Sequence, residues 1–274
     1  MGFSGHHARK RFGQHWLRDD SVLQRIVEAA DLQPTDRVLE VGPGRGALTE
    51  RLLSTDVTAV HAIELDRDLV AGLQDRFADQ PAFSLHQGDV LEAPLELSDG
   101  HIADKVVANI PYNITGPLLE RLVGRLDRPV DPPYQRLVLL VQKEVAERIR
   151  ARPGHSSFSA LSVRMQLLAR CRSVCPVPPR CFQPPPKVQS EVICLEPLSP
   201  SERVEPALAS QVESLLKQAF LARRKMLRNT LAGVADPDRL QALAASAGFN
   251  LQQRPQELAP HTWVALARGL NRGD

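Results

Sequence analysis

The stretch VLEVGPGRGALT (residues 38–49) decides the fold that the sequence predicts. Its first residues form an apolar run typical of a buried strand, and GALTERLLS (residues 46–54) has the pattern of a helix. Gly42, Gly44 and Gly46 stand between the two segments. A glycine-rich turn from strand to helix is typical of open α/β sheets, and G-x-G-x-x-A here also fits the dinucleotide-binding pattern.

Strand-like and helix-like segments alternate through the front two-thirds of the chain. The expected strands are residues 38–42, 59–66, 83–89, 105–110 and 136–142, and the expected helices are 46–54, 67–79, 117–126 and 143–151. Such near-continuous apolar strands predict a parallel sheet that is covered on both faces. Two more strand-like segments, 165–178 and 189–196, flank a proline-rich loop and predict a hairpin at the sheet edge.

The pattern changes after residue 197. PLSPSERVEP (residues 197–206) has the composition of a linker, and the segments after it favour short helices: residues 212–220, 223–231, 238–248 and 261–270. We therefore expect an α/β domain over residues 1–197, a linker over 198–206 and a small all-helical domain over 207–274.

Composition excludes several classes of protein. The chain has 274 residues, 43% of them hydrophobic, which suffices for one sizeable core and a small second one. It contains no run of about 18 apolar residues, and its basic start lacks the apolar segment of a secretory signal, so we expect neither a membrane span nor export. The four cysteines form no C-x-x-C pair, which favours reduced thiols in a cytoplasmic protein over a metal site.

Basic residues are unevenly distributed along a chain whose net charge is only +2. From Arg148 to Lys187 there are eight Lys or Arg residues and no Asp or Glu. Two further clusters are Arg9-Lys10-Arg11 and Arg223-Arg224-Lys225 with Arg228. One cluster alone would favour a solvated surface, but three together favour a polyanionic partner.

Two details of the glycine loop argue against a dinucleotide. Pro43 lacks the backbone N–H that a pyrophosphate would need, and Glu40 places a carboxylate close to the loop. A diphosphate is repelled there, whereas a ligand with an ammonium or sulfonium group is attracted. S-adenosylmethionine carries both cations and no phosphate.

Polar residues end the next two strands. Glu64, 22 residues after Gly42, suits the two hydroxyls of a ribose, which NAD and S-adenosylmethionine share. Asp89 in QGDV can accept a hydrogen bond from an adenine amino group, although Asp is also common as a turn or cap residue.

The motif NIPYN (residues 109–113) follows the fourth strand and indicates chemistry on an exocyclic amine. Such a nitrogen is a poor nucleophile because its lone pair is delocalised into the ring. The side-chain oxygen of Asn109 and the carbonyl of Ile110 or Pro111 can each accept a hydrogen bond from one N–H of the amine. Together they aim its lone pair at a methyl group. Tyr112 can stack on a flat base. The alternative, a turn or helix cap, explains the Asn and the Pro only.

As a set, VLEVGPGRGALT, AIELD, QGDV and NIPYN resemble the ribosomal RNA adenine N6-dimethyltransferases, as do RKRFGQHWL, FQPPPKVQSEV and RRKMLRNTL. The resemblance covers about residues 9 to 270. It implies a Rossmann-like class I S-adenosylmethionine-dependent methyltransferase sheet with an antiparallel edge hairpin and a small C-terminal helical domain. The small-subunit enzymes are most similar. The large-subunit enzymes of macrolide resistance share the core motifs and are the alternative.

The resemblance also implies roles for individual residues. Asn109, Pro111, Tyr112 and Phe182 are the expected catalytic residues, with the adenine held between Tyr112 and Phe182. From the sequence alone, Phe182 would instead be a hydrophobic anchor of an edge loop. The expected cofactor-binding residues are Gln14, His15, Leu17, Glu40, Gly42, Gly44, Glu64, Asp89 and Asn109. In the segment over the cofactor, His15 stands where the family usually has Asn, and Trp16 stands where it usually has Phe. No metal is expected.

The implied activity is dimethylation of N6 in two adjacent adenines of the 3′-terminal hairpin of small-subunit ribosomal RNA during ribosome assembly. The implied partners are ribosomal RNA and the immature small subunit, and the chain is expected to act as a cytoplasmic monomer. The expected RNA-binding residues are Arg9, Lys10, Arg11, Arg148, Lys187, Arg223, Arg224, Lys225 and Arg228.

Three other classes remain as alternatives. A hydride-transferring Rossmann enzyme is disfavoured by Pro43, Glu40 and NIPYN. A non-catalytic assembly factor is disfavoured by the intact NIPYN. Methylation of a protein glutamine or of DNA adenine uses a similar grip, and the C-terminal helical segment argues for RNA instead.

Overall fold

The computed structural model describes residues 14–97 and 100–271, which form two compact units. The first unit contains the described chain up to Leu122, together with Tyr134–Ala146 and Cys171–Pro197. The second contains Val123–Pro133, Glu147–Arg170 and the described chain from Leu198 on. The last change of unit falls after Pro197. The sequence did not show that two earlier segments also belong to the second unit.

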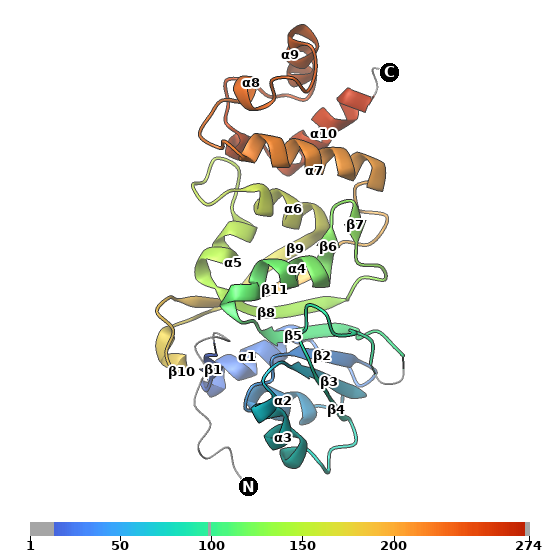
Figure 1. Cartoon of the computed structure of the whole chain (residues 1–274), viewed down its shortest axis with the longest axis vertical. Coiled ribbons are helices and arrows are strands. Elements are labelled where there is room, and N and C mark those ends of the chain that lie inside the picture. The colour runs from blue at the N-terminus through green and yellow to red at the C-terminus, as the bar shows by residue number, and fades with distance from the viewer. Residues whose placement is uncertain (1–13, 98–99, 272–274) are drawn as a thin grey trace. The chain divides into compact units, whose positions relative to one another are not determined.

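Among the described residues, a seven-stranded sheet forms the core of the first unit (Figure 1). Its strands are β2 (Arg37–Val41), β3 (Ala59–Glu64), β4 (Phe83–Gln87), β5 (Lys105–Asn109), β8 (Arg136–Gln142), β9 (Ala169–Val177) and β11 (Ser190–Pro197). Their spatial order is β4-β3-β2-β5-β8-β11-β9. The pairs from β4 to β8 are parallel, and β11 runs antiparallel to β8. The predicted parallel sheet with a hairpin at one edge is confirmed.

The strand order reverses direction beside β2. From β2 the chain moves outward to β3 and β4, then returns to β5 on the other side of β2. Ligands of open α/β sheets bind at such a switch point, outside the carboxyl ends of the strands. The glycine loop after β2 and the NIPYN motif after β5 therefore border the same crevice.

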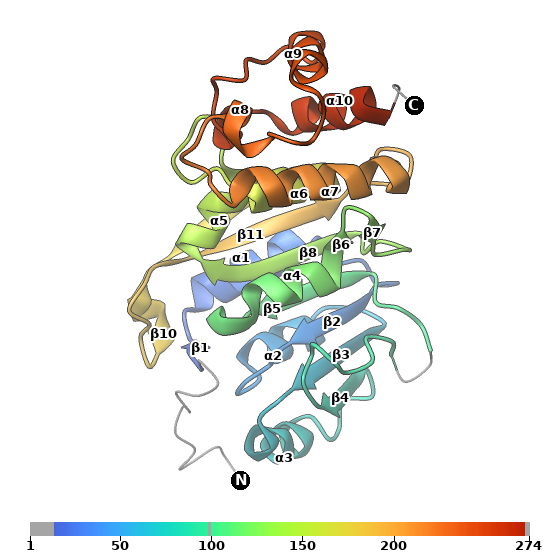
Figure 2. The same ribbon diagram turned by 45° about the horizontal axis from the view of Figure 1, so that its top comes forward.

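Helices cover both faces of this sheet. They are α1 (Asp20–Ala30), α2 (Ala47–Leu53), α3 (Arg67–Arg76) and α4 (Thr115–Val123). Helix α5 (Lys143–Arg150) follows β8 and contains the change from the first unit to the second. Ile26 of α1 and Leu52 of α2 share one buried cluster with Val107 and Val138 of the sheet. Because side chains alternate along a strand, the neighbours of Val107 face the other side, where α4 lies opposite α1 (Figure 2).

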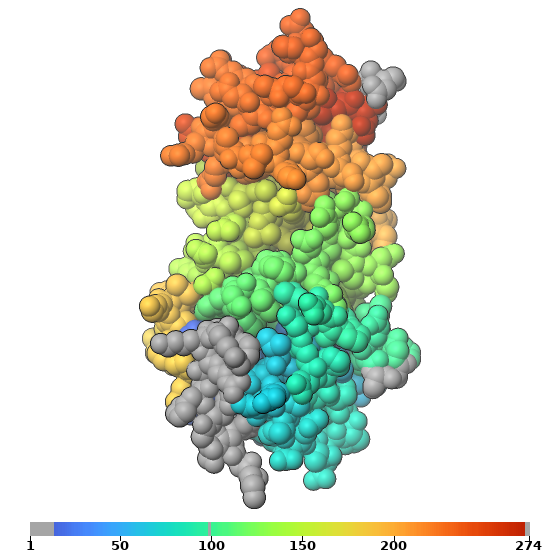
Figure 3. Space-filling model, viewed as in Figure 1, coloured from blue at the N-terminus to red at the C-terminus, as the bar shows by residue number. Residues whose placement is uncertain are grey.

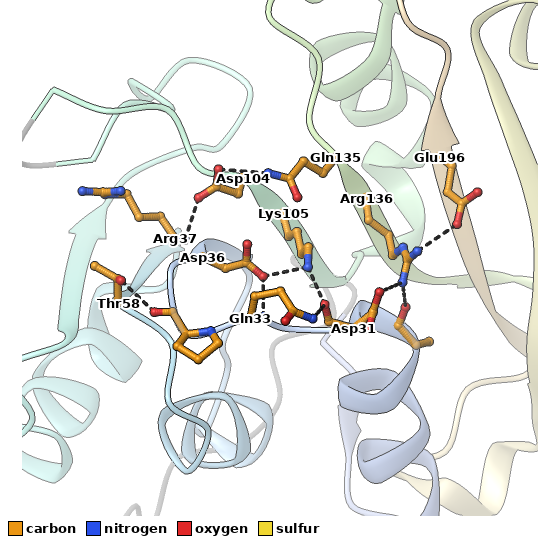
Figure 4. A network of polar contacts seen from close by, with 12 residues as sticks. Asp31, Gln33, Asp36, Arg37, Thr58, Asp104, Lys105, Gln135, Arg136 and Glu196 are labelled. Atoms are coloured by element: carbon orange, nitrogen blue, oxygen red, sulfur yellow. Dashed lines mark hydrogen bonds and ion pairs between the residues drawn. The ribbon is translucent and has the colours of Figure 1, made fainter.

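A polar network joins the amino-terminal ends of the parallel strands (Figure 4). At its centre the ammonium group of Lys105 lies 2.7 Å from Asp36, and both side chains are at most 6% exposed. Arg136 forms ion pairs with Asp31 and Glu196, each over 3.1 Å. These charges stabilise the end of the sheet that faces away from the glycine loop.

The second unit is mainly helical. Its helices are α6 (Ala160–Leu168), α7 (Pro206–Phe220), α8 (Leu227–Thr230), α9 (Pro237–Ser246) and α10 (Pro260–Asn271), with a short β6–β7 pair (Gly124–Arg125, Arg128–Pro129). Trp263 is fully buried, and its ring centroid lies 6.0 Å from that of Phe220. The residues of α7 to α10 form a continuous mass in the space-filling view (Figure 3).

Three local predictions were wrong or incomplete. Residues 165–168, expected in a strand, end α6, which begins after a capping box between Ser159 and Ser162. Residues 223–226, expected in a helix, precede α8, because the N–H groups of Leu227 and Arg228 bond the carbonyls of Gln253 and Leu251. Helix α1 was not predicted.

No described helix combines the length and the apolar character needed to cross a bilayer. No group of three or more His, Cys, Asp or Glu side chains within 14–97 and 100–271 is arranged to hold a metal ion. The four cysteines are free thiols.

Candidate active site

The loop after β2 depends on glycine. Gly42 and Gly44 have φ angles of +68° and +60°, in the left-handed region that favours glycine. A Cβ atom at Gly44 would lie 2.9 Å from the indole of Trp16, which packs directly on the loop. The guanidinium of Arg45 lies 4.0 Å from the Trp16 ring centroid on this loop. The turn is thus shaped for close packing of one aromatic ring.

Two buried carboxylates lie beside this loop. Glu64 ends β3, where its two oxygens accept the N–H groups of Gly44 over 3.1 Å and Asp66 over 2.8 Å. Burial raises the pKa of Glu64 against these hydrogen bonds. Glu40 in β2 is 1% exposed, and its Oε2 meets no hydrogen-bond donor among the described residues. Burial raises the pKa of Glu40 to about 8.

These residues fit the predicted cofactor. Glu40 lines a cavity of about 330 Å³ with Gly42, Pro43, Gly44 and Asn109. A buried carboxylate oxygen without a donor is costly unless a ligand supplies one. A cationic ligand supplies it, whereas a pyrophosphate would add repulsion and would find no N–H at Pro43. This set of acceptors therefore suits S-adenosylmethionine rather than NAD.

The orientation of Asn109 follows from one hydrogen bond. Its Nδ2 donates to the main-chain oxygen of His15 over 3.0 Å. A carbonyl can only accept, so the amide nitrogen must face His15. The side-chain oxygen Oδ1 remains as the acceptor for another group, which is the function that the sequence predicted for it.

The rest of NIPYN forms a rigid corner. Pro111 has φ −57° and ψ 128° and precedes a short 3-10 turn, η2 (Tyr112–Ile114), whose Ile114 N–H bonds the Pro111 carbonyl over 3.1 Å. A carbonyl oxygen has two lone pairs, so one remains. The Tyr112 hydroxyl lies 2.5 Å from the Ser190 hydroxyl, which fixes the half-buried ring.

The segment of residues 14–17 covers the crevice. Strand β1 (Trp16–Leu17) pairs antiparallel with β10 (Phe182–Gln183), and the Gln14 amide donates to Asp66 over 2.8 Å. Trp16 lines both the larger cavity and a second one of about 70 Å³, which Glu64, Asn109 and Tyr112 also line. The indole therefore borders both cavities.

Some predicted site residues lie elsewhere than expected. Phe182 is 4% exposed and belongs to the buried cluster that contains Leu17 and Cys181. In the described chain, the ring that stacks on Tyr112 is that of His15. Asp89 accepts the N–H of Leu91 over 2.9 Å, as a turn residue does, and lines neither cavity. The remaining predicted cofactor residues gather around the crevice: Gln14, His15, Leu17, Glu40, Gly42, Gly44, Glu64 and Asn109.

The predicted RNA-binding residues belong to different parts of the chain. Arg9, Lys10 and Arg11 lie outside the described residues. Lys187 is exposed in the first unit, within the proline-rich loop. The others belong to the second unit, where Arg223 donates to the Ser156 carbonyl over 2.6 Å. That bond brings the loop after α5 next to the loop after α7. The exposed members of this set are Arg148, Arg224, Lys225 and Arg228.

Three contacts were missed from the sequence. Trp16 on the glycine loop, Arg45 over its ring and Ser190 on the Tyr112 hydroxyl are all close to the crevice. Ser190 follows FQPPPKVQ directly, so its place next to the predicted adenine loop was a usable signal.

Comparison with known proteins identifies the family. The family model described as ribosomal RNA adenine dimethylase matches residues 5–271. A ribosomal RNA small subunit methyltransferase A of Synechococcus sp. (strain CC9605) is 90% identical over 274 residues, all of both chains. A protein with the same name from Parasynechococcus marenigrum (strain WH8102) is 78% identical over 273 residues, covering 100% of this chain and 90% of that one.

Solved structures of related proteins support the same family assignment. A dimethyladenosine transferase from Plasmodium falciparum is 26% identical, with a TM-score of 0.78 over 94% of this chain and 98% of that one. The 23S rRNA methyltransferase ErmE is 28% identical, with a TM-score of 0.72 over 93% and 99%. The chain therefore belongs to the ribosomal RNA adenine dimethylase family.

Proposed function

We propose that this protein dimethylates N6 of two adjacent adenines in the 3′-terminal hairpin of small-subunit ribosomal RNA, within the immature small subunit. As a member of its family it is an S-adenosylmethionine-dependent ribosomal RNA adenine dimethyltransferase. The relatives that share most of its sequence carry a small-subunit name, which supports the choice of subunit. We propose further that it acts in the cytoplasm as a monomer.

The observation that carries the proposal is the orientation of Asn109. With Nδ2 held by the His15 carbonyl, Oδ1 is the atom left to accept an N–H of the target amine. The free lone pair of the Pro111 carbonyl is the second acceptor. Two acceptors on one amino group direct its nitrogen lone pair toward a fixed point, which is catalysis by positioning.

We propose that the cofactor is held by the loop after β2 and by two carboxylates. Glu64 accepts from its ribose hydroxyls, since each carboxylate oxygen can accept more than one hydrogen bond. Glu40 attracts its cationic end, and Gly42 and Gly44 allow close approach. Asp89 accepts from its adenine amino group. When bound, S-adenosylmethionine supplies an electrophilic methyl group on sulfur.

We propose that the target adenine leaves its stack and lies on Tyr112. Ser190 holds the tyrosine hydroxyl, so the ring is presented at a fixed tilt. Phe182 is the proposed second wall. Because that side chain is buried beside Leu17, it must turn out of the core to reach the base.

The second methylation follows from the same grip. After the first transfer the amine has one N–H, which either Asn109 Oδ1 or the Pro111 carbonyl can accept. No strong base is needed, because the nitrogen becomes acidic as the methyl group joins it and loses its proton afterwards. Both acceptors are uncharged, so neither depends on a particular protonation state.

We propose that RNA is held mainly through its phosphates. Of the exposed cations of the second unit, Arg224 and Lys225 lie in the loop after α7, next to Arg223, which bonds the Ser156 carbonyl. Arg148 lies in α5 and Arg228 in α8. Lys187 and the basic residues 9–11 are proposed as further contacts. Such contacts fix position and orientation without reading the sequence.

Restoration of the modification in cells tests this proposal. The gene is expressed in a bacterium that lacks dimethyladenosine in its small-subunit RNA, and nucleosides of each purified subunit are analysed. N6,N6-dimethyladenosine returning to the small subunit alone is expected. Its appearance in the large subunit alone would assign the protein to the other branch of the family.

A further inference from the structure

The imidazole of His15 lies on the ring of Tyr112. The ring centroids are 5.7 Å apart and the planes differ by 26°. The other side of the contact is also fixed, because His15 Nδ1 lies 2.8 Å from the carbonyl oxygen of Pro184. A carbonyl only accepts, so Nδ1 carries the proton. The imidazole of His15, which is itself a flat nitrogen heterocycle, therefore lies on the Tyr112 ring, where the proposed function places the target base.

The space around this stack is too small for a purine. The cavity that His15 shares with Asn109, Pro111 and Tyr112 measures about 70 Å³. Pockets that hold small ligands measure about 300–1,000 Å³. With the imidazole in place, a base cannot stack on the same face of the Tyr112 ring.

The main chain of His15 has a separate function from its ring. Its carbonyl oxygen accepts from Asn109, and the next residue, Trp16, pairs with Gln183 in β10. The backbone is therefore held from two sides. Rotation about the side-chain bonds of His15 can remove the ring from Tyr112 while the carbonyl continues to orient Asn109.

We propose that the His15 imidazole is a place-holder for the target adenine, which it gives up when the base stacks on Tyr112. The proposal rests on the proposed function, because it needs Tyr112 to receive the base. Adenine displaces the ring because a purine offers a larger stacking face than an imidazole.

Displacement makes His15 a specificity residue. Every base must compete with a ring that is already in place, so the apparent affinity for the base equals its intrinsic affinity multiplied by the fraction of molecules in which Tyr112 is free. A base that is presented without other contacts between the RNA and the protein displaces the His15 ring poorly. An adenine that is held at the crevice by the bound small subunit displaces the ring more readily.

Removal and enlargement of the ring test the proposal. His15→Ala keeps the main-chain carbonyl that orients Asn109 but removes the ring from Tyr112. His15→Phe replaces the imidazole with a larger aromatic ring, which stacks on Tyr112 more strongly. Aromatic pairs of this kind correspond to a factor of about three to ten in an equilibrium constant. His15→Ala should lower KM for under-methylated small subunits by about that factor, and His15→Phe should raise it, with the effects on KM rather than on kcat.

Binding is measured as well as turnover. The equilibrium dissociation constant for under-methylated small subunits is measured with S-adenosylhomocysteine present. Like KM, it should fall for His15→Ala and rise for His15→Phe. The matched control is His261→Ala, which removes an exposed histidine of α10. KM for S-adenosylmethionine is measured alongside, and melting temperature shows whether each variant is folded.

The outcomes are distinct. Tighter RNA binding by His15→Ala and weaker binding by His15→Phe support the proposal. Weaker binding by His15→Ala would overturn it, because the ring would then grip the base. Equal binding by all variants, or an effect confined to the KM for S-adenosylmethionine, would also overturn it. If wild-type enzyme makes no dimethyladenosine in small subunits, the proposed function fails instead.

Discussion

The side-chain amide of Asn109 donates a hydrogen bond to the main-chain oxygen of His15 over 3.0 Å. This bond joins the end of a central strand to a segment 94 residues earlier in the chain. It decides which atom of the amide faces the crevice. The chemistry that we propose depends on that orientation, so Asn109 is the first residue to mutate.

Asn109→Ala should lower kcat by at least about 100-fold, the usual cost of removing one hydrogen-bonding group that acts in the transition state. Asn109→Asp keeps an acceptor but places an oxygen against the His15 carbonyl, so its kcat should lie between those of Asn109→Ala and wild type. Transfer of labelled methyl groups to under-methylated small subunits measures both. Equal rates for wild type and Asn109→Ala would exclude the grip.

Glu40 makes cofactor binding depend on pH. With its pKa raised to about 8 by burial, this carboxyl is mostly protonated at pH 7 and ionised above pH 8. A cationic ligand favours the ionised form, so affinity for S-adenosylmethionine should rise from pH 7 to pH 9. Close to one proton should be released per cofactor bound at pH 7.

Calorimetry in buffers of different ionisation enthalpy measures this release. Glu40→Gln, which has nearly the same shape and no titration in this range, is the matched control and should release less. Binding enthalpies of the wild type that do not vary with the buffer would show that Glu40 keeps its proton when the cofactor binds.

The Lys105–Asp36 ion pair should be structural. Removing one member of a buried pair leaves an uncompensated charge and costs about 3–5 kcal/mol. Lys105→Met should lower the free energy of unfolding by that amount. Arg51→Ala, which breaks the partly exposed pair with Asp20, should cost about 1 kcal/mol or less. Urea unfolding compares the two, and similar losses would contradict the assignment.

RNA binding should weaken steeply with salt. Each phosphate contact contributes a slope of about 0.7 to 0.9 in the logarithmic salt dependence of affinity. Arg224→Ala should reduce the slope by about that amount, whereas Arg67→Ala, an 81% exposed arginine of α3, should leave it unchanged. Affinities for the small subunit at several salt concentrations measure both. An unchanged slope for Arg224→Ala would remove that residue from the interface.

The sheet and the crevice could be predicted because each leaves a local pattern. Apolar runs end at Gly42, Glu64 and Asn109, and the parallel order of the strands brings these ends together. Helix α6 could not be read in the same way. Met165, Leu167 and Leu168 lead directly into β9, so one mainly apolar segment contains the end of a helix and the start of a strand.

The place-holding ring could not be predicted at all. The sequence placed His15 near the cofactor, but its stack on Tyr112 depends on where β1 pairs with β10, a contact across more than 160 residues. Phe182 shows the same limit, since the pairing that aligns it with Leu17 also places it in the core. Local pattern gives the residue types of a site, whereas long-range pairing sets which of them touch.

The measurement that tests the central claim most directly uses purified protein and labelled S-adenosylmethionine. Under-methylated small subunits and protein-free large-subunit RNA are offered separately, and the labelled nucleosides are identified. The account predicts N6,N6-dimethyladenosine in the small subunit only, at two methyl groups on each of two adenines. Label in the large-subunit RNA alone, or no label in either with the cofactor bound, would contradict it.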